Sequence, residues 1–134
     1  MTVRYLLDSD ICIFAMKRRS PKLLRLLDQR APTSAISVVA YGELEFGAAM
    51  SARRDEAAAH LAALLETFQV MPLPLHAAPR YVAIRAALQR IGQPIGSNDL
   101  WIAAHALAEN VTLVTNNESE FRRVPGLRVE NWVR

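Results

Sequence analysis

The chain has 134 residues, half of them apolar, which corresponds to one ordinary domain with its own core. Its longest apolar runs span only a few residues and exclude a transmembrane helix. The first residues place Arg4 in a strand-like stretch and do not resemble a signal peptide. The single cysteine, Cys12, excludes an internal disulfide and favours a reducing, cytoplasmic location. A net charge of +3, with 14 arginines among 16 basic residues, suits a polyanionic partner that offers phosphate groups.

The apolar pattern predicts short strands that alternate with helices. Ser37 is suited to cap the helix that follows the second strand, and Pro72 and Pro74 make the third strand short or confine it to an edge. Predicted strands occupy residues 3–7, 34–36, 70–75, 112–115 and 127–129, and predicted helices begin near residues 11, 21, 38, 53, 77 and 97. This alternation predicts an α/β fold, with one domain over residues 1–134 and a short, mostly parallel central sheet covered by helices on both faces.

Three acidic residues lie where such a fold gathers functional side chains. Asp8 closes the first apolar run, Glu43 lies inside the helix after the second strand, and Asp99 opens the helix near residue 97. Ligand sites of parallel sheets lie beyond the carboxyl ends of the strands. Carboxylates that meet there ionise together only if a cation lies between them, and Mg²⁺ prefers oxygen ligands. The sequence therefore predicts a divalent-metal site. Gly42 and Gly47, beside Glu43 in sequence, are expected to permit close packing of a neighbouring element.

The segments around these acids resemble the successive motifs of PIN-domain ribonucleases, most closely the VapC toxins of bacterial VapBC toxin–antitoxin systems. The matching segments are residues 6–13 (LLDSDICI), 43–48 (ELEFGA), 94–106 (PIGSNDLWIAAHA), 114–121 (VTNNESEF) and 121–132 (FRRVPGLRVENW). The resemblance spans essentially the whole chain, and the segment 94–106 is its most specific part.

The resemblance implies a PIN-like domain and a magnesium- or manganese-dependent endoribonuclease that cleaves structured RNA such as tRNA or rRNA. It also implies a homodimer without membrane attachment, inhibited by a cognate VapB-type antitoxin. Asp8, Glu43 and Asp99 carry over as the catalytic and metal-binding residues. A metal ion held by them would lower the pKa of a bound water and neutralise charge on the phosphate, so no nucleophilic side chain is required.

The chain departs from the family pattern at the fourth acid, where it has Asn117. Asn117 can still offer a carbonyl oxygen, and either Glu120, three residues further on, or Asp10 can supply the missing carboxylate. Ser9 replaces a common threonine and keeps the hydroxyl group. Thr115 and Asn116 are expected to support the site, and the candidates for binding RNA phosphates are Arg122, Arg123, Lys17 and Arg18.

Two other functions are compatible with parts of the sequence. Asp8 and Asp10 also fit the opening motif of haloacid-dehalogenase-type phosphatases, but the only lysines, Lys17 and Lys22, lie far upstream of Thr115, and no suitable acidic pair follows it. A catalytically inactive, RNA-binding PIN domain is the second alternative, because the fourth acid is missing. The three histidines lack metal-pair spacing, so none is expected to be catalytic.

Overall fold

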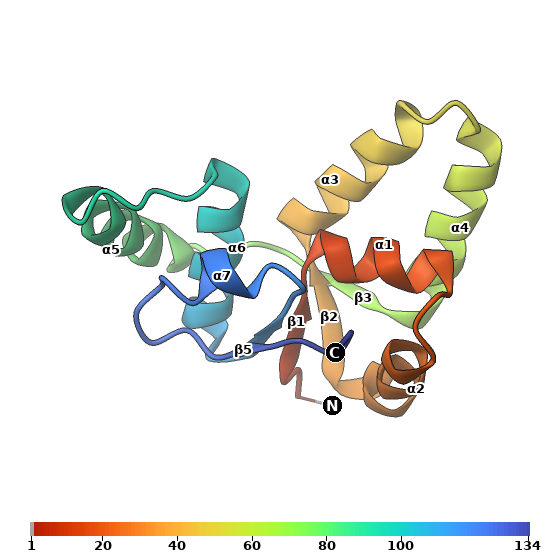
Figure 1. Ribbon diagram of the computed structural model, residues 1–134, viewed down its shortest axis with the longest axis horizontal. Coiled ribbons are helices and arrows are strands. Elements are labelled where there is room, and N and C mark those ends of the chain that lie inside the picture. The colour runs from red at the N-terminus through yellow and green to blue at the C-terminus, as the bar shows by residue number, and fades with distance from the viewer. Residues whose placement is uncertain (1) are drawn as a thin grey trace.

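The computed structural model describes residues 2–134 and contains a five-stranded sheet in which all strand pairings are parallel (Figure 1). The strand order is β3-β2-β1-β4-β5. The strands are β1 (Tyr5–Leu7), β2 (Ser34–Ser37), β3 (Gln69–Met71), β4 (Thr112–Val114) and β5 (Val129–Glu130). The predicted α/β class with a short parallel sheet is confirmed. The predicted third and fifth strands are displaced: β3 ends before Pro72, and β5 begins only where its backbone meets β4.

Seven α-helices connect the strands, together with a short 3₁₀ helix, η1 (Ala31–Thr33), in the part of the chain that the structure describes. They are α1 (Ser9–Lys17), α2 (Pro21–Arg30), α3 (Val38–Ala49), α4 (Arg54–Thr67), α5 (Ala77–Arg90), α6 (Ser97–Glu109) and α7 (Glu118–Phe121). Figure 1 shows α1 to α4 and α5 to α7 as two groups on opposite sides of the central strands. This division follows from right-handed crossovers, because the chain leaves β1 toward β3 in one direction and returns to β4 and β5 in the other.

Local sequence explains several helix starts. Ser20 accepts a hydrogen bond from the backbone of Leu23, and Pro21 occupies the first position of α2. Ser37 accepts from the backbone N–H of Val39 and caps α3, as expected. None of the helices within residues 2–134 has the length and hydropathy needed to cross a membrane.

The core lies on both faces of β1, the middle strand. Leu6, Leu7, Ile36 and Leu113 on neighbouring strands are essentially inaccessible to solvent, which explains their continuous apolar runs. On the side of the sheet that carries α5 to α7, α5 packs on α6, and the rings of Tyr81 and Trp101 stack with centroids 4.0 Å apart. The carboxyl ends of β1, β2 and β4 therefore share one edge of the sheet, where Asp8, Ser37 and Thr115 follow or end the strands.

Candidate active site: an acidic cluster at the strand ends

Asp8 lies directly after β1 and caps α1. One carboxylate oxygen accepts the backbone N–H of Ser9 at 2.8 Å, and the other accepts the hydroxyl of Thr115 at 2.9 Å. Only 4% of the residue is exposed. Burial, and then the charge of Asp10, raises the pKa of Asp8 to about 7. A carboxylate in this position is therefore held in place but lacks compensation for its charge.

Asp10 lies in the first turn of α1 and shares the Thr115 hydroxyl with Asp8 as a hydrogen-bond donor. Its Oδ2 accepts the backbone N–H of Asn116 at 3.0 Å, and the Thr115 hydroxyl lies 3.4 Å from both of its oxygens. Burial raises the pKa of Asp10 as well. Thr115 thus links two strand-end acids, which agrees with the supporting role expected for it.

Asp99, in the first turn of α6, has a second group of acids around it. The pKa of Asp99 is raised to about 7. Burial is the largest cause, and the smaller causes are the charge of Glu120, a hydrogen bond between the two carboxyl groups and the charge of Glu43. Glu120 accepts the backbone N–H of Gly96 at 3.2 Å and the side-chain amide of Asn117. Glu120 and Asn117 therefore lie together, as their spacing predicted, and Glu120 brings a carboxylate next to Asp99.

Glu43 projects from α3, and its Oε1 accepts the hydroxyl of Ser9 at 3.3 Å. Ser9 thus connects the helix after β1 with the helix after β2. Gly42 and Gly47 were expected to permit close packing beside Glu43, and this expectation is wrong. A Cβ atom built on either glycine meets nothing within 4 Å. Both positions line open grooves beside α3, so they leave space rather than contact.

The cluster contains five carboxylates and no paired cation. The four ion pairs within residues 2–134 all involve other acids, namely Glu56, Glu118 and Glu130. In the same range no three His, Cys, Asp or Glu side chains are arranged as a bound metal ion requires. The charge of Asp10 nevertheless raises the pKa of both Asp8 and Asp99, so these acids lie close enough to repel one another, and they ionise together only if a cation lies between them. A set of oxygen donors with this excess of negative charge fits Mg²⁺ or Mn²⁺.

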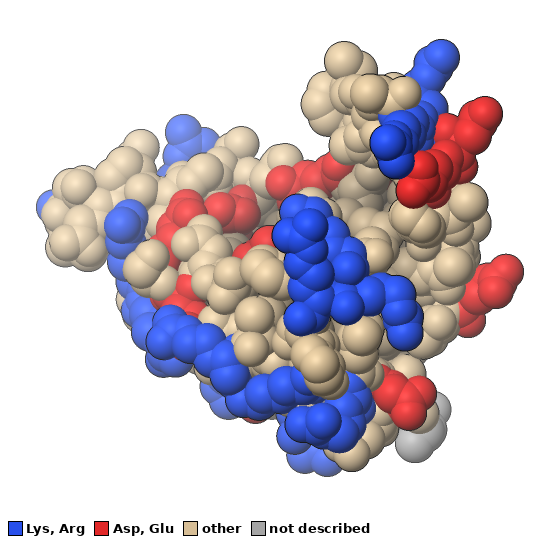
Figure 2. All heavy atoms as spheres, turned by 45° about the vertical axis from the view of Figure 1, so that its right-hand side comes forward, with Lys and Arg blue, Asp and Glu red and all other residues tan. Residues whose placement is uncertain are grey.

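The basic residues proposed for RNA phosphates differ in their surroundings. Arg122 is bound to Glu118 at 2.9 Å, so it is less free than its sequence context suggested. Arg123 donates to the carbonyl of Pro94 at 3.3 Å, beside the loop that leads to Asp99. Figure 2 shows acidic side chains gathered in a hollow, with basic side chains along its margin. Lys17 borders the groove that contains Glu43, whereas Arg18 ends α1 with a positive φ and lines a different depression.

Two histidines and the cysteine lie outside the acidic cluster, and the third histidine, His60, lines the groove that contains Glu43. His105 is fully buried, and its Nδ1 lies 3.0 Å from the Ser37 hydroxyl. His76 contacts the carbonyl of Ala108. Burial raises the pKa of the Cys12 thiol far above its ordinary value, so it is an inert core residue.

Two polar residues near the site, Asn131 and Glu118, were not singled out from the sequence. Asn131 donates to the Asn116 side chain and to Glu118, both at 2.9 Å. Both residues lie in segments that carry the family resemblance, which is the only signal in the sequence that points to them. The two partners of the Asn131 amide nitrogen lie 13 and 15 residues away in the chain, so no local pattern reveals these contacts.

Comparison with known proteins agrees with this architecture. The sequence profile of the PIN domain matches residues 5–127. The chain is 37% identical to ribonuclease VapC2 of Rickettsia felis over 96% of this chain and 97% of the relative. It is 32% identical to the tRNA(fMet)-specific endonuclease VapC of Salmonella typhimurium, covering 97% and 98% of the two chains. 

Solved structures resemble the fold equally closely. A chain in the crystal structure of VapBC2 from Rickettsia felis, bound to a promoter DNA fragment, superposes with a TM-score of 0.91 at 35% identity, covering 97% of this chain and 99% of the other. A chain in DNA-bound VapBC from Salmonella typhimurium gives a TM-score of 0.93 at 32% identity, covering 98% and 99%. These matches leave no basis for the phosphatase alternative.

Proposed function

The chain belongs to the PIN-domain family and, within it, to the VapC ribonucleases, and we propose that it is a magnesium- or manganese-dependent endoribonuclease toxin of a type II toxin–antitoxin system. The observation that carries the metal dependence is the cluster of Asp8, Asp10, Glu43, Asp99 and Glu120, whose burial and mutual repulsion are not offset by any paired cation among residues 2–134. A divalent cation supplies the charge that this arrangement lacks.

Asp8, Glu43 and Asp99 would hold the ion, with Glu120 rather than Asn117 as the fourth charge and Asp10 beside Asp8. When bound, the ion lowers the pKa of water and neutralises negative charge on the phosphate. The side chains of this chain orient the ligands: the Thr115 hydroxyl holds Asp8 and the Ser9 hydroxyl holds Glu43.

The proposed substrate is a structured RNA, tRNA or rRNA, and a relative from Salmonella typhimurium is named for tRNA(fMet). An acidic centre repels RNA unless basic residues draw the phosphates toward it. Arg123, beside the loop to Asp99, and Lys17, beside the groove with Glu43, are suited to this role. The proposed place of action is the cytoplasm, where such RNA is found.

The direct test is cleavage of tRNA and rRNA by the purified protein in Mg²⁺, in Mn²⁺ and in EDTA. Asp8→Asn and Asp99→Asn should each lower the rate at least about a hundredfold, because even the loss of an outer partner of a metal ligand costs 10–100-fold. The exposed Asp28→Asn, on α2, is the matched control and should cleave normally. Wild-type protein that binds RNA but never cleaves it in either metal would instead support the inactive, RNA-binding alternative.

The proposed inhibitor is a VapB-type antitoxin encoded with this chain, as in the VapBC complexes of the relatives. A groove of about 560 Å³ between α1, α3 and α4 offers it a binding surface. Apolar Ile13, Leu44 and Leu61 line this groove, and Glu43 connects it with the acidic cluster. An arginine or lysine of the partner that enters the cluster would replace the charge of the ion.

Expression of the chain alone should stop bacterial growth, and co-expression of the partner should restore it. A partner that binds without lowering RNase activity would contradict this mode of inhibition.

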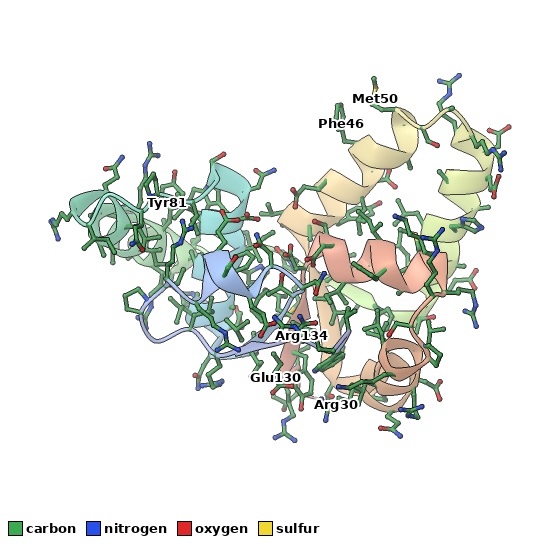
Figure 3. The ribbon with its side chains drawn as sticks, viewed as in Figure 1. Arg30, Phe46, Met50, Tyr81, Glu130 and Arg134 are labelled. Carbon is green, nitrogen blue, oxygen red and sulfur yellow. The ribbon has the colours of Figure 1, made fainter. Side chains whose placement is uncertain are left out.

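The chain is also proposed to form a homodimer. Phe46 and Met50 on α3 are 69% and 70% exposed, and Val82 on α5 is 64% exposed. Figure 3 shows Phe46 and Met50 extending from α3 away from the body of the molecule. Exposed apolar side chains of this size, above all the pair Phe46 and Met50 one helical turn apart, are typical of protein interfaces.

A further inference from the structure

Residues 131–134, here called the return segment, follow β5 and pass beside the loop that follows β4. The backbone N–H of Thr115 donates to the carbonyl of Glu130 at 3.0 Å, which fixes the start of the segment at the acidic edge of the sheet. Trp132 anchors it from below, because its buried ring meets Tyr5 edge-on and its indole N–H donates to Glu130. The segment is therefore held on both sides of Asn131.

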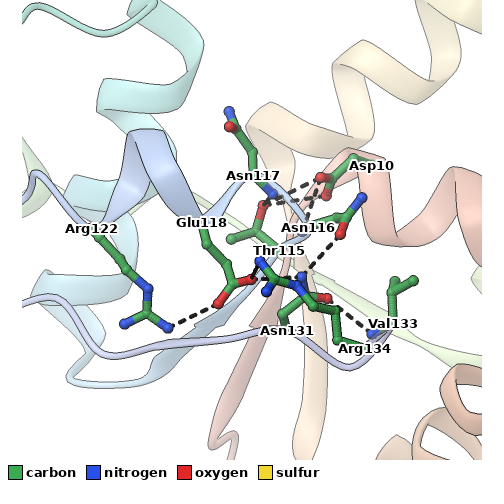
Figure 4. A network of polar contacts seen from close by, with 9 residues as sticks. All are labelled: Asp10, Thr115, Asn116, Asn117, Glu118, Arg122, Asn131, Val133 and Arg134. Carbon is green, nitrogen blue, oxygen red and sulfur yellow. Dashed lines mark hydrogen bonds and ion pairs between the residues drawn. The ribbon is translucent and has the colours of Figure 1, made fainter.

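Asn131 uses its whole side-chain amide in this position (Figure 4). Its nitrogen donates to Asn116 Oδ1 and to Glu118 Oε2, each at 2.9 Å, and its oxygen accepts the backbone N–H of Val133 at 3.0 Å. Two donors and one acceptor in fixed directions define the place of the amide group closely. The loop at Asn116 is thereby tied to the return segment.

Glu118 holds Asn131 from the other side. Its carboxylate also accepts from Arg122 at 2.9 Å and binds Arg134. The hydrogen bond from Asn131, and then that from Arg122, lowers the pKa of Glu118. Glu118 is thus a charged centre that joins α7 to the return segment, in contrast to Glu120 on the same helix, which turns toward Asp99.

The same loop connects the return segment to the acidic cluster. The backbone N–H of Asn116 donates to Asp10 Oδ2 at 3.0 Å, and the preceding residue, Thr115, contacts both Asp8 and Asp10. A continuous path of hydrogen bonds runs from Glu118 through Asn131 and Asn116 to Asp10.

We propose that Asn131 and Glu118 are positioning residues of the nuclease site, which hold the Asn116 loop so that Asp10 keeps the orientation in which the acidic cluster binds its metal ion. This inference rests on the proposed metal-dependent function. Partners of this kind typically contribute 10–100-fold to metal affinity without touching the metal. Asn131→Ala is therefore expected to weaken Mn²⁺ binding by about tenfold or more.

The test is titration of the RNA-free protein with Mn²⁺ by calorimetry. Asn131→Ala should bind Mn²⁺ about tenfold more weakly than wild type, but in an Asp10→Ala background the same change should have less than a twofold effect, because its route to the site is gone. Asp28→Asn, an exposed substitution on α2 outside this hydrogen-bond path, is the control and should leave Mn²⁺ affinity unchanged.

Unchanged Mn²⁺ affinity in Asn131→Ala, or equal weakening with and without Asp10, would overturn the proposal. Arg134→Ala removes one contact of Glu118 at a side chain that is 75% exposed, so it preserves the fold if Asn131→Ala does not. It should weaken Mn²⁺ binding measurably, and unchanged binding would count against the proposal. Asp8→Asn separates the two levels of inference: if that variant also binds Mn²⁺ normally, the metal site itself is wrong.

Discussion

Asp8→Asn should abolish cleavage and yet make the metal-free protein more stable. The pKa of Asp8 rises from 3.8 to about 7 in the fold, first through burial and then through the charge of Asp10. Because the folded state binds the Asp8 proton more tightly, the contribution of Asp8 to the free energy of unfolding is greatest below about pH 4 and is lost as the pH rises through about 7. Asparagine carries no charge at any pH, so the variant should lack this loss.

The size of the effect follows from the shift. About three pKa units at about 1.4 kcal/mol each give an upper value of about 4 kcal/mol at pH 8, and sharing of the proton with Asp10 reduces it to about 2–4 kcal/mol. The hydrogen bonds need not be lost. In the variant the amide oxygen can still accept the N–H of Ser9. Its NH₂ group can donate to the Thr115 hydroxyl, which in the wild-type protein is the donor to Asp8.

The assay is urea denaturation in EDTA at pH 8 and again near pH 4, where the two proteins should differ little. The control Asp28→Asn alters an exposed carboxylate by the same atoms and should stay within about 0.5 kcal/mol of wild type at both pH values. Saturating Mg²⁺ should stabilise the wild type, by about 2.7 kcal/mol at a hundred times the dissociation constant, and should leave Asp8→Asn nearly unchanged. If Asp8→Asn is less stable than wild type at pH 8 without metal, the argument from buried, uncompensated charge is wrong.

Three further outcomes are expected. Glu120→Gln should raise the Mg²⁺ concentration needed for cleavage more than Asn117→Ala does, because it removes a charge beside Asp99, and a silent Glu120→Gln with a severe Asn117→Ala would assign the ligand to the amide. Light scattering at tens of micromolar should give the mass of a dimer, and Phe46→Lys should shift it toward the monomer if α3 forms the interface. His105→Leu should leave cleavage intact and change the free energy of unfolding by no more than about 1 kcal/mol. The variant loses one hydrogen bond to Ser37, but it also removes a buried ring nitrogen, Nε2, that has no hydrogen-bond partner among residues 2–134.

The fold was predictable because its determinants are local. Apolar runs such as Tyr5–Leu7 indicate strands buried on both faces, and Ser37 marks a helix start by its own side chain. The pairing of Glu120 with Asn117 was predictable for the same reason, since a spacing of three residues places them on one helical face. The residues that determine these strands, this helix start and this side-chain pair lie within one helical turn or one strand of each other.

Other features depend on contacts between distant segments, and they carry no local signal. The bond from Asn131 to Asn116 joins residues that follow two different strands. The space beside Gly47 is set by where α1 and α4 lie relative to α3, which the helical pattern of α3 does not specify. Sequence reasoning therefore found the acids and the neighbouring Ser9, Thr115 and Asn116, and missed Asn131 and Glu118, which contact the Asn116 loop from a distant segment.

The position of β1 between β2 and β4 has a consequence for the timing of toxicity during protein synthesis. Asp8 emerges early, but one neighbour of its strand, Thr112–Val114, is made more than a hundred residues later. At about 5–20 residues per second the ribosome needs about 5–20 s to add that stretch. Until then the sheet lacks β4 and β5, and Asp8 lacks the Thr115 hydroxyl that holds its carboxylate. A nascent or truncated chain would therefore be harmless, and a cell would have that interval to supply whatever restrains the finished enzyme.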